Sequence, residues 1–202
     1  MNYLAIDTSS KNLTIVINYN DKLHKFFDQD CGVNHSVSLM QRLEDLVEEN
    51  GVDLSKIDFF VSVVGAGSFT GIRIGVSTIK AFCIAYNKPV LSITSFDTLA
   101  YNKQNGKVLA VIDAKHNGFY VCGYQDLNVV LPPQYIDGER LRELSCEYQL
   151  ISATTIEGIN CQQVCVLQGL ITAIEGKKHL ITTDIESLVP LYVRKSQAEE
   201  NR

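Results

Sequence analysis

The stretch from residue 63 to residue 75 constrains the fold of this chain more than any other. An apolar run at 59–64 predicts a buried strand, and helical periodicity begins soon after it. The turn between them holds glycines, which permit positive φ and close backbone approach, and hydroxyl side chains that can cap a helix. The residues that define this turn are Gly65, Gly67, Ser68, Phe69, Thr70, Gly71 and Arg73.

Two interpretations of this glycine turn stay open at the level of the pattern. A strand, a glycine turn and a helix N-terminus together form an anion site, because free N–H groups and the helix dipole point outward. The alternative is a tight, capped turn without a ligand, which the pattern by itself favours because short glycine motifs match by chance. The turn is neither a Walker loop, which ends in Gly-Lys-Ser or Gly-Lys-Thr, nor a G-x-G-x-x-G motif.

The helix that follows the turn is apolar on nearly all sides. One face is expected to pack on a sheet and carries Ile72, Val76, Ile79, Cys83 and Tyr86. The other side is not polar either, and carries Ile74, Thr78, Ala81, Phe82 and Ala85. Because a helix of this kind is buried on two sides, we expect a second neighbour, either an internal helix or another protein.

Length and composition place the chain among ordinary globular proteins. Its 202 residues suffice for one large domain or two small ones, and its net charge of −5 argues against a non-specific nucleic-acid binder. The six cysteines show no C-x-x-C spacing, and no two of the four histidines lie one helical turn apart, so we expect no metal site. Without a signal peptide or a membrane-length apolar stretch, a reduced cytoplasmic protein is the simplest expectation.

The order of predicted elements is the same at the start of each half. In the first half, strands are predicted at 3–8, 13–18 and 22–27, followed by a helix that starts at His35-Ser36. The strand, glycine turn and helix described above come next, and after them a strand at 90–93 and a helix at 95–101. After a polar stretch, strands are predicted at 108–113, 119–125 and 129–136, with Asn117-Gly118 as a two-residue turn, and a helix at 162–175. An aspartate, Asp7 or Asp113, stands near the end of the first strand each time.

This repeated order predicts the fold class. It favours the α/β, two-lobe actin-like or sugar-kinase (ASKHA) fold, in which mixed sheets carry flanking helices. We expect an N-terminal lobe over residues 1–102 and a smaller, shortened lobe over residues 103–202. A fold class does not by itself establish a function.

Several short motifs occur in an order that resembles a known family. They are Ile6-Asp7-Thr8-Ser9, His35-Ser36, the glycine turn through Gly75, Ile112-Asp113-Ala114-Lys115 and Pro190-Leu191-Tyr192-Val193-Arg194. Together they resemble the bacterial TsaB (YeaZ) family over nearly the whole chain, most strongly over residues 1–120. The segment 125–185 matches weakly and looks shortened. Ala66 stands where the family's first glycine stretch usually has proline.

The resemblance implies membership of the complex that adds a threonylcarbamoyl group to an adenosine next to the tRNA anticodon. In that family catalysis belongs to a longer paralogue, TsaD, which carries a metal and the carbamoyl-adenylate substrate, and a small ATPase, TsaE, joins the pair. TsaB proteins bind TsaD through the first-lobe helices and form homodimers through the same face. The resemblance therefore implies a non-catalytic subunit that reaches tRNA only through the complex, with ATP or ADP bound only at the partner interface.

We expect that interface to use apolar and small residues of the first two helices, with residues 68–73 at its rim. The residues are Leu39, Met40, Leu43, Ile74, Thr78, Ala81 and Ala85. Arg73 is placed where its guanidinium can meet a phosphate or carboxylate from the partner. The apolar second side of the 71–86 helix predicts such a neighbour independently of the resemblance.

The turns after the two aspartates resemble degenerate nucleotide sites. An actin-type ATPase holds phosphate and Mg²⁺ with Asp-x-Gly-Thr, whereas Asp7-Thr8-Ser9 and Asp113-Ala114-Lys115 lack the glycine that lets backbone N–H groups reach phosphate. We therefore expect Asp7 and Asp113 to form turns rather than to bind Mg²⁺. The alternative is an ATPase or small-molecule kinase that uses both aspartates.

His35 and Ser36 are the remaining candidates for chemistry. A nucleophilic role is one interpretation, but capping of the helix by Asn34, His35 or Ser36 is favoured. A metallo- or serine peptidase is a further alternative, and no Ser/His/Asp or metal-ligand set in the sequence supports it.

Overall fold

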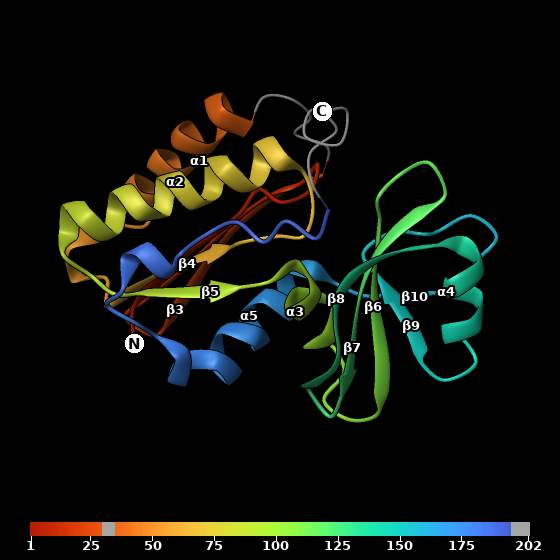
Figure 1. The fold of residues 1–202 in the computed structure, drawn as a ribbon. Helices are drawn as coiled ribbons and strands as arrows, with labels where there is room; N and C mark the ends of the chain where they lie inside the picture. Colours follow the sequence, from red (N-terminus) through yellow and green to blue (C-terminus); the bar gives the residue numbers. More distant parts are fainter. Residues whose placement is uncertain (30–34, 195–202) are drawn as a thin grey trace. The chain divides into compact units, whose positions relative to one another are not determined.

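The computed structural model of this chain describes residues 1–29 and 35–194, and for residues 35–37 it describes the backbone alone (Figure 1). Backbone contacts divide the chain into two units. The first comprises Met1–Ile93 and Ile174–Pro190, and the second comprises Thr94–Ala173 and the residues from Leu191 onward. The boundary expected from the sequence fell after residue 102, and the return of the chain to the first unit was not expected.

The first unit contains a mixed sheet of five strands in the order β3-β2-β1-β4-β5. The strands are β1 (Tyr3–Asp7), β2 (Leu13–Tyr19), β3 (Lys22–Asp28), β4 (Phe59–Val63) and β5 (Val90–Ile93). β1 pairs antiparallel with β2 and parallel with β4, which pairs parallel with β5. Every residue of β1 and β4 is buried, as expected for apolar runs at the centre of a sheet that is covered on both faces.

Two helices lie side by side over one face of this sheet, α1 (His35–Glu49) and α2 (Phe69–Tyr86) (Figure 1). α2 begins after Ser68, whose side chain accepts a hydrogen bond from the Gly71 N–H, and it ends at Asn87 in the left-handed conformation. Ile72, Val76, Ile79 and Cys83 are each at most 5% exposed, so the predicted sheet-facing side is confirmed for these four, while Tyr86 is half-buried. Phe82, predicted on the other side, instead stacks on Phe60 of β4. The 3₁₀ segments of this unit are Leu54–Lys56, Lys178–Leu180 and Ile185–Ser187.

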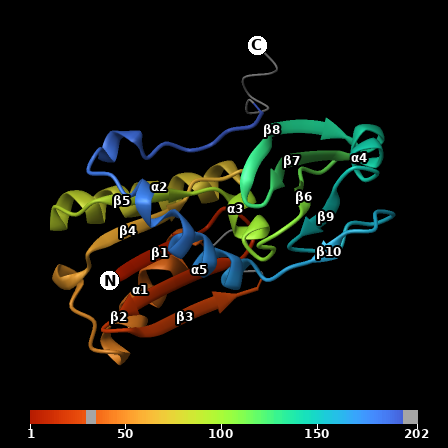
Figure 2. The same ribbon diagram turned by 90° about the horizontal axis from the view of Figure 1, so that it is seen from below.

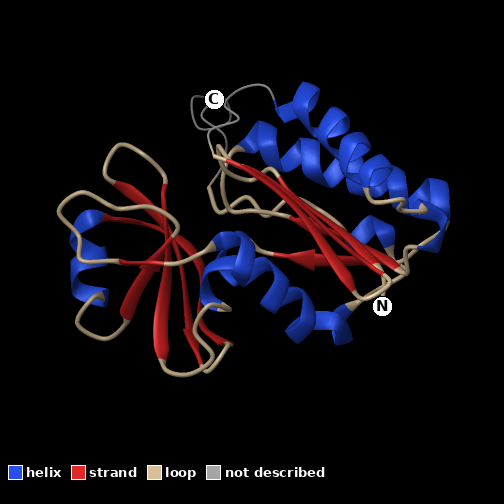
Figure 3. Cartoon of the chain, turned by 180° about the vertical axis from the view of Figure 1, so that it is seen from behind, coloured by secondary structure: helices blue, strands red, loops and turns tan. Residues whose placement is uncertain are grey.

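The second unit repeats the sheet of the first (Figures 1 and 2). Its strands are β6 (Lys107–Asp113), β7 (Gly118–Gln125), β8 (Asn128–Asp137), β9 (Gln149–Ser152) and β10 (Gln162–Gln163), in the order β10-β9-β6-β7-β8. β6 pairs antiparallel with β7 and parallel with β9, just as β1 pairs with β2 and β4. Two mixed five-stranded sheets of identical topology confirm the predicted actin-like α/β fold (Figure 3).

The helices of the second unit depart from the repeat. α3 (Ser95–Ala100) and α4 (Gly138–Leu144) belong to this unit, and α5 (Val166–Lys177) begins in it and continues past its boundary at Ala173. α4 connects β8 to β9 as α1 connects β3 to β4. The 18-residue helix α2 connects β4 to β5, whereas residues 153–161, all of them described, connect β9 to β10 without a helix. α4, β9 and β10 were not predicted, and β10, which consists of two glutamines, carries no apolar pattern at all.

The connection between β6 and β7 also differs from its prediction. Asn117-Gly118 is not a two-residue turn, because Gly118 already belongs to β7 and the loop consists of residues 114–117. Lys115, His116 and Asn117 all have positive φ, and the Gly118 N–H donates to the Lys115 carbonyl. Three of the four loop residues are left-handed, a conformation that residue preferences do not signal for lysine.

Buried thiols and phenols give the protein an expected sensitivity to alkali. Burial raises the pKa of Tyr3 to about 12 and that of Cys83 to about 11, while the same groups in the unfolded chain lose their protons near 10.0 and 9.0. The folded protein therefore holds protons that the unfolded chain releases, so the free energy of unfolding is highest below about pH 9 and falls as the pH rises toward these folded-state values.

Urea unfolding at a series of pH values measures this loss, and Cys83→Ala is expected to reduce its slope between about pH 9 and 11. A free energy of unfolding that stays constant over this interval would contradict the expectation.

Candidate functional site

The glycine turn of residues 65–71 packs against the loop that follows β1. The Ser68 N–H donates to the Ser9 carbonyl at 2.7 Å, and the Thr8 hydroxyl donates to the Gly71 carbonyl at 2.7 Å. A Cβ at Gly67 would overlap the Ser9 carbonyl oxygen, and one at Gly71 would overlap that of Thr8. The glycines thus let two backbone segments touch, so the geometry supports the tight-turn interpretation over an open phosphate cradle.

Asp7 stabilises the loop that follows β1 through a hydrogen bond within that loop. Asp7 as a whole is 3% exposed, and its Oδ1 accepts a hydrogen bond from the Ser9 N–H at 2.8 Å. Thr8 and Ser9 are buried as well. A carboxylate that accepts from the N–H two residues later forms an Asx turn, which is the turn-forming role expected from the sequence.

Asp113 forms the same turn at the end of β6 in the second unit. Its Oδ1 accepts from the Lys115 N–H at 2.7 Å, and its Oδ2 lies 2.9 Å from Lys115 Nζ. Partial burial raises the pKa of Asp113, but the hydrogen bonds and the positive charge of Lys115 outweigh it and lower that pKa overall. Each aspartate therefore closes its own loop, and a Mg²⁺–nucleotide would have to compete with these contacts.

The residues of the expected partner interface fall into two groups. Leu39 and Leu43 are 1% and 3% exposed and belong to the core of the first unit, so they present no surface to a partner. Met40, between them, is 51% exposed. On α2, Ala81 and Ala85 are exposed, and Ile74 and Thr78 are half-buried. The apolar outer surface of these helices therefore centres on α2.

Ile84 is a further member of this surface that the sequence interpretation missed. It is 69% exposed, more than any other large hydrophobic residue that the structure describes. On a helical wheel of α2 it falls beside Arg73 and Ser77, both exposed, so the wheel already placed it on the outer side. We define the α2 surface as Ile74, Ala81, Ile84 and Ala85 together with Met40 of α1.

The rim residues of the glycine turn lie at the N-terminus of α2. Ser68, Thr70 and Arg73 are exposed there, while Phe69 is half-buried and Gly65 is buried. α1 is described from His35, the first described residue after residue 29. The side chains of His35 and Ser36 lie outside the described residues, as does Asn34, so the capping and nucleophile interpretations stay predictions.

The described ranges hold neither a cluster of metal-ligating side chains nor a membrane-length apolar helix. No three His, Cys, Asp or Glu side chains in residues 1–29 and 35–194 are grouped closely enough to hold a metal ion. None of the helices in these ranges combines the length and the apolar character needed to cross a membrane.

Comparisons with known proteins point to one family. Residues 29–160 match the family model described as TsaD: tRNA N6-adenosine threonylcarbamoyltransferase. A protein of Escherichia coli (strain K12), named tRNA threonylcarbamoyladenosine biosynthesis protein TsaB, is 28% identical over 162 residues, which span 73% of this chain and 69% of that protein. The protein of the same name from Bacillus subtilis (strain 168) is 34% identical over 136 residues, 65% of this chain and 58% of the relative.

A solved structure extends the likeness to the whole fold. YeaZ from Pseudomonas aeruginosa superposes with a TM-score of 0.78 at 21% sequence identity. The superposition covers 95% of this chain and 99% of that one, so both units share the architecture.

Proposed function

This chain belongs to the TsaB (YeaZ) family, and we propose that it serves tRNA threonylcarbamoyladenosine biosynthesis as a non-catalytic subunit that binds a TsaD protein through the α2 surface. The same face would form a homodimer when the partner is absent. TsaE joins through the pair, and tRNA is reached only through the complex.

The observation that carries the proposal is the exposure of Ile84. Ile84 is 69% exposed and Met40 of the neighbouring helix α1 is 51% exposed, and we take these apolar side chains as parts of the proposed interaction surface. Complete burial of such a side chain contributes about 1.5–3 kcal/mol. The flanking Ala81 and Ala85 are short, so a partner helix can approach the α2 backbone closely.

The loops after β1 and β6 support a role without catalysis. The backbone carbonyls of Thr8 and Ser9 occupy the space beside the glycines of the turn. Asp7 and Asp113 each accept a hydrogen bond from a backbone N–H of their own loop. A phosphate-binding loop instead keeps its N–H groups open to the ligand. We therefore propose that ATP or ADP binds only where TsaD completes the site.

Isothermal titration with ATP and Mg²⁺ tests this proposal, first with the chain alone and then with the chain mixed with TsaD of the same organism. We expect no heat from the chain alone and binding in the mixture, with a stable complex in size-exclusion light scattering. Micromolar binding by the chain alone, with Mg²⁺-dependent hydrolysis that Asp7→Ala abolishes, would instead establish the ATPase or kinase alternative. Absence of a complex would refute the subunit role.

A further inference from the structure

The second unit contains a hollow at the position where its helices depart from the repeat. In the first unit, α2 packs beside α1 against the sheet (Figure 1). In the second unit, residues 153–161 replace that helix, and a hollow of about 420 Å³ lies between α4, β9 and this connection. Its size is within the range of small-molecule sites, and it is separate from the α2 surface of the proposed function.

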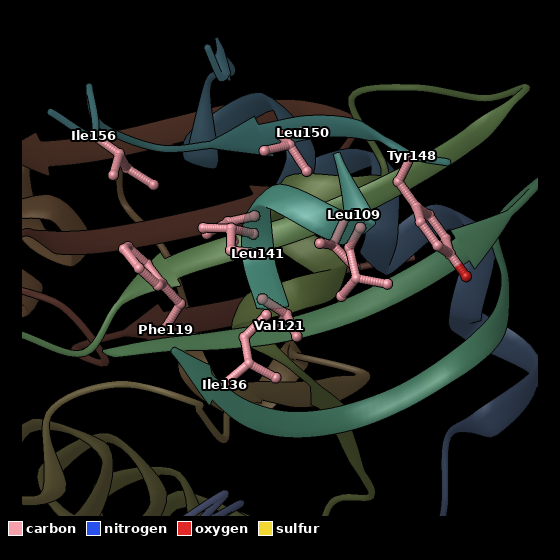
Figure 4. Close-up of a cluster of buried hydrophobic side chains, with 10 residues drawn as sticks. Leu109, Phe119, Val121, Ile136, Leu141, Tyr148, Leu150 and Ile156 are labelled. Atoms are coloured by element: carbon pink, nitrogen blue, oxygen red, sulfur yellow. The ribbon is translucent and has the colours of Figure 1, made fainter. Parts of the chain in front are cut away.

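The floor of this hollow is the hydrophobic core of the second unit. Leu141, Tyr148 and Leu150 line it, and all three belong to the core cluster in Figure 4. They are at most 9% exposed and come from α4, the turn after it and β9. An apolar floor of this kind accepts the hydrocarbon part of a ligand and offers a charged group no partner.

The wall of the hollow carries a single charge. Arg142 is the one charged residue among those that line it, and its guanidinium makes no hydrogen bond or ion pair with any residue that the structure describes. Its neighbour Arg140 differs, because it is paired with Glu143. Asn160 and Gln162 add amide groups to the same wall. A guanidinium beside amide donors matches the geometry of a carboxylate.

We propose that this hollow binds small organic carboxylates with an aliphatic or aromatic body. The body lies on Leu141, Tyr148 and Leu150, and the carboxylate accepts hydrogen bonds from Arg142. The site exists because the second unit lacks the counterpart of α2, which leaves part of its sheet to be covered by an irregular connection.

Hexanoate and its uncharged analogue hexanamide test the proposal on the full chain, with backbone amide NMR shifts as the readout. A ligand of this size is expected to bind with a Kd on the order of 1 mM. We expect hexanoate to shift the amides of residues 141–150 and 158–162, and to bind about tenfold more tightly than hexanamide. Equal affinities, or shifts spread over other parts of the chain, would overturn the assignment.

Three variants test separately whether binding needs the positive charge of Arg142 and whether it needs the open volume of the hollow. Arg142→Gln should bring the affinity for hexanoate down to that for hexanamide, whereas the matched Arg140→Gln should leave the preference intact because Arg140 is paired outside the hollow. Ser145→Trp fills the hollow from its exposed rim and should remove the binding of both probes. Retention of hexanoate binding in Ser145→Trp, or of the preference in Arg142→Gln, would refute the proposal.

Discussion

Replacing Gly71 by alanine is expected to lower the free energy of unfolding by roughly 3 kcal/mol. The added Cβ would overlap the carbonyl oxygen of Thr8, which is part of the backbone and cannot swing aside as a flexible side chain does. The Thr8 hydroxyl also donates to the Gly71 carbonyl, so a shift that relieves the overlap lengthens this buried hydrogen bond. The start of α2 and the loop after β1 would therefore separate.

Whether Gly71→Ala lowers or raises the free energy of unfolding decides between two descriptions of the turn. Glycine to alanine within a helix normally stabilises by about 1 kcal/mol, because alanine has the higher helix propensity. Chemical denaturation of Gly71→Ala therefore distinguishes tight packing, which predicts destabilisation, from an open turn, which predicts a gain. Ser77→Ala on the exposed side of α2 is the control and should change the free energy of unfolding by no more than about 0.5 kcal/mol.

Replacing Ala81 by glutamate is expected to abolish both the proposed homodimer and the proposed complex with TsaD while leaving the fold intact. Ala81 is exposed in the isolated chain, so the carboxylate stays hydrated and the free energy of unfolding hardly changes. In the complex the same carboxylate would be buried against apolar groups without a partner. A penalty of about 3 kcal/mol weakens association by roughly a hundredfold.

Size-exclusion light scattering of the chain alone and of its mixture with TsaD measures this loss. Ala153→Glu is the matched control, because Ala153 is also exposed but belongs to the second unit and is not a member of the α2 surface. The control should assemble like the wild type. An Ala81→Glu protein that still dimerises and still binds TsaD would exclude the α2 surface as the interface.

Local chemistry in the sequence determined most of the first unit. The apolar runs of β1 and β4 are long enough, and the turn residues between β1, β2 and β3 specific enough, to predict the strands within a residue or two. Capping by Ser68 was also predictable, because it depends on residues three positions apart. The recurrence of Asp7 and Asp113 indicated the repeated sheet, since both aspartates form the same local turn.

Only the tertiary structure decided that the glycine turn packs against the loop after β1, and which apolar residues face outward. The contact between Gly71 and Thr8 joins residues 63 positions apart, and local pattern carries no information about such a pairing. Leu39 and Met40 are both apolar neighbours in α1, yet one is buried and the other exposed, because the rotation of α1 over the sheet depends on how its side chains pack.

The same reason applies to α2. The helical wheel of α2 identified the side that packs on the sheet, but how much of Ile84 is exposed became visible only in the packed structure. The replacement of a helix by residues 153–161 was hidden as well, because the hollow beside α4 is formed by segments that meet only in the fold. Sequence determined the elements, and packing between distant segments decided the surfaces.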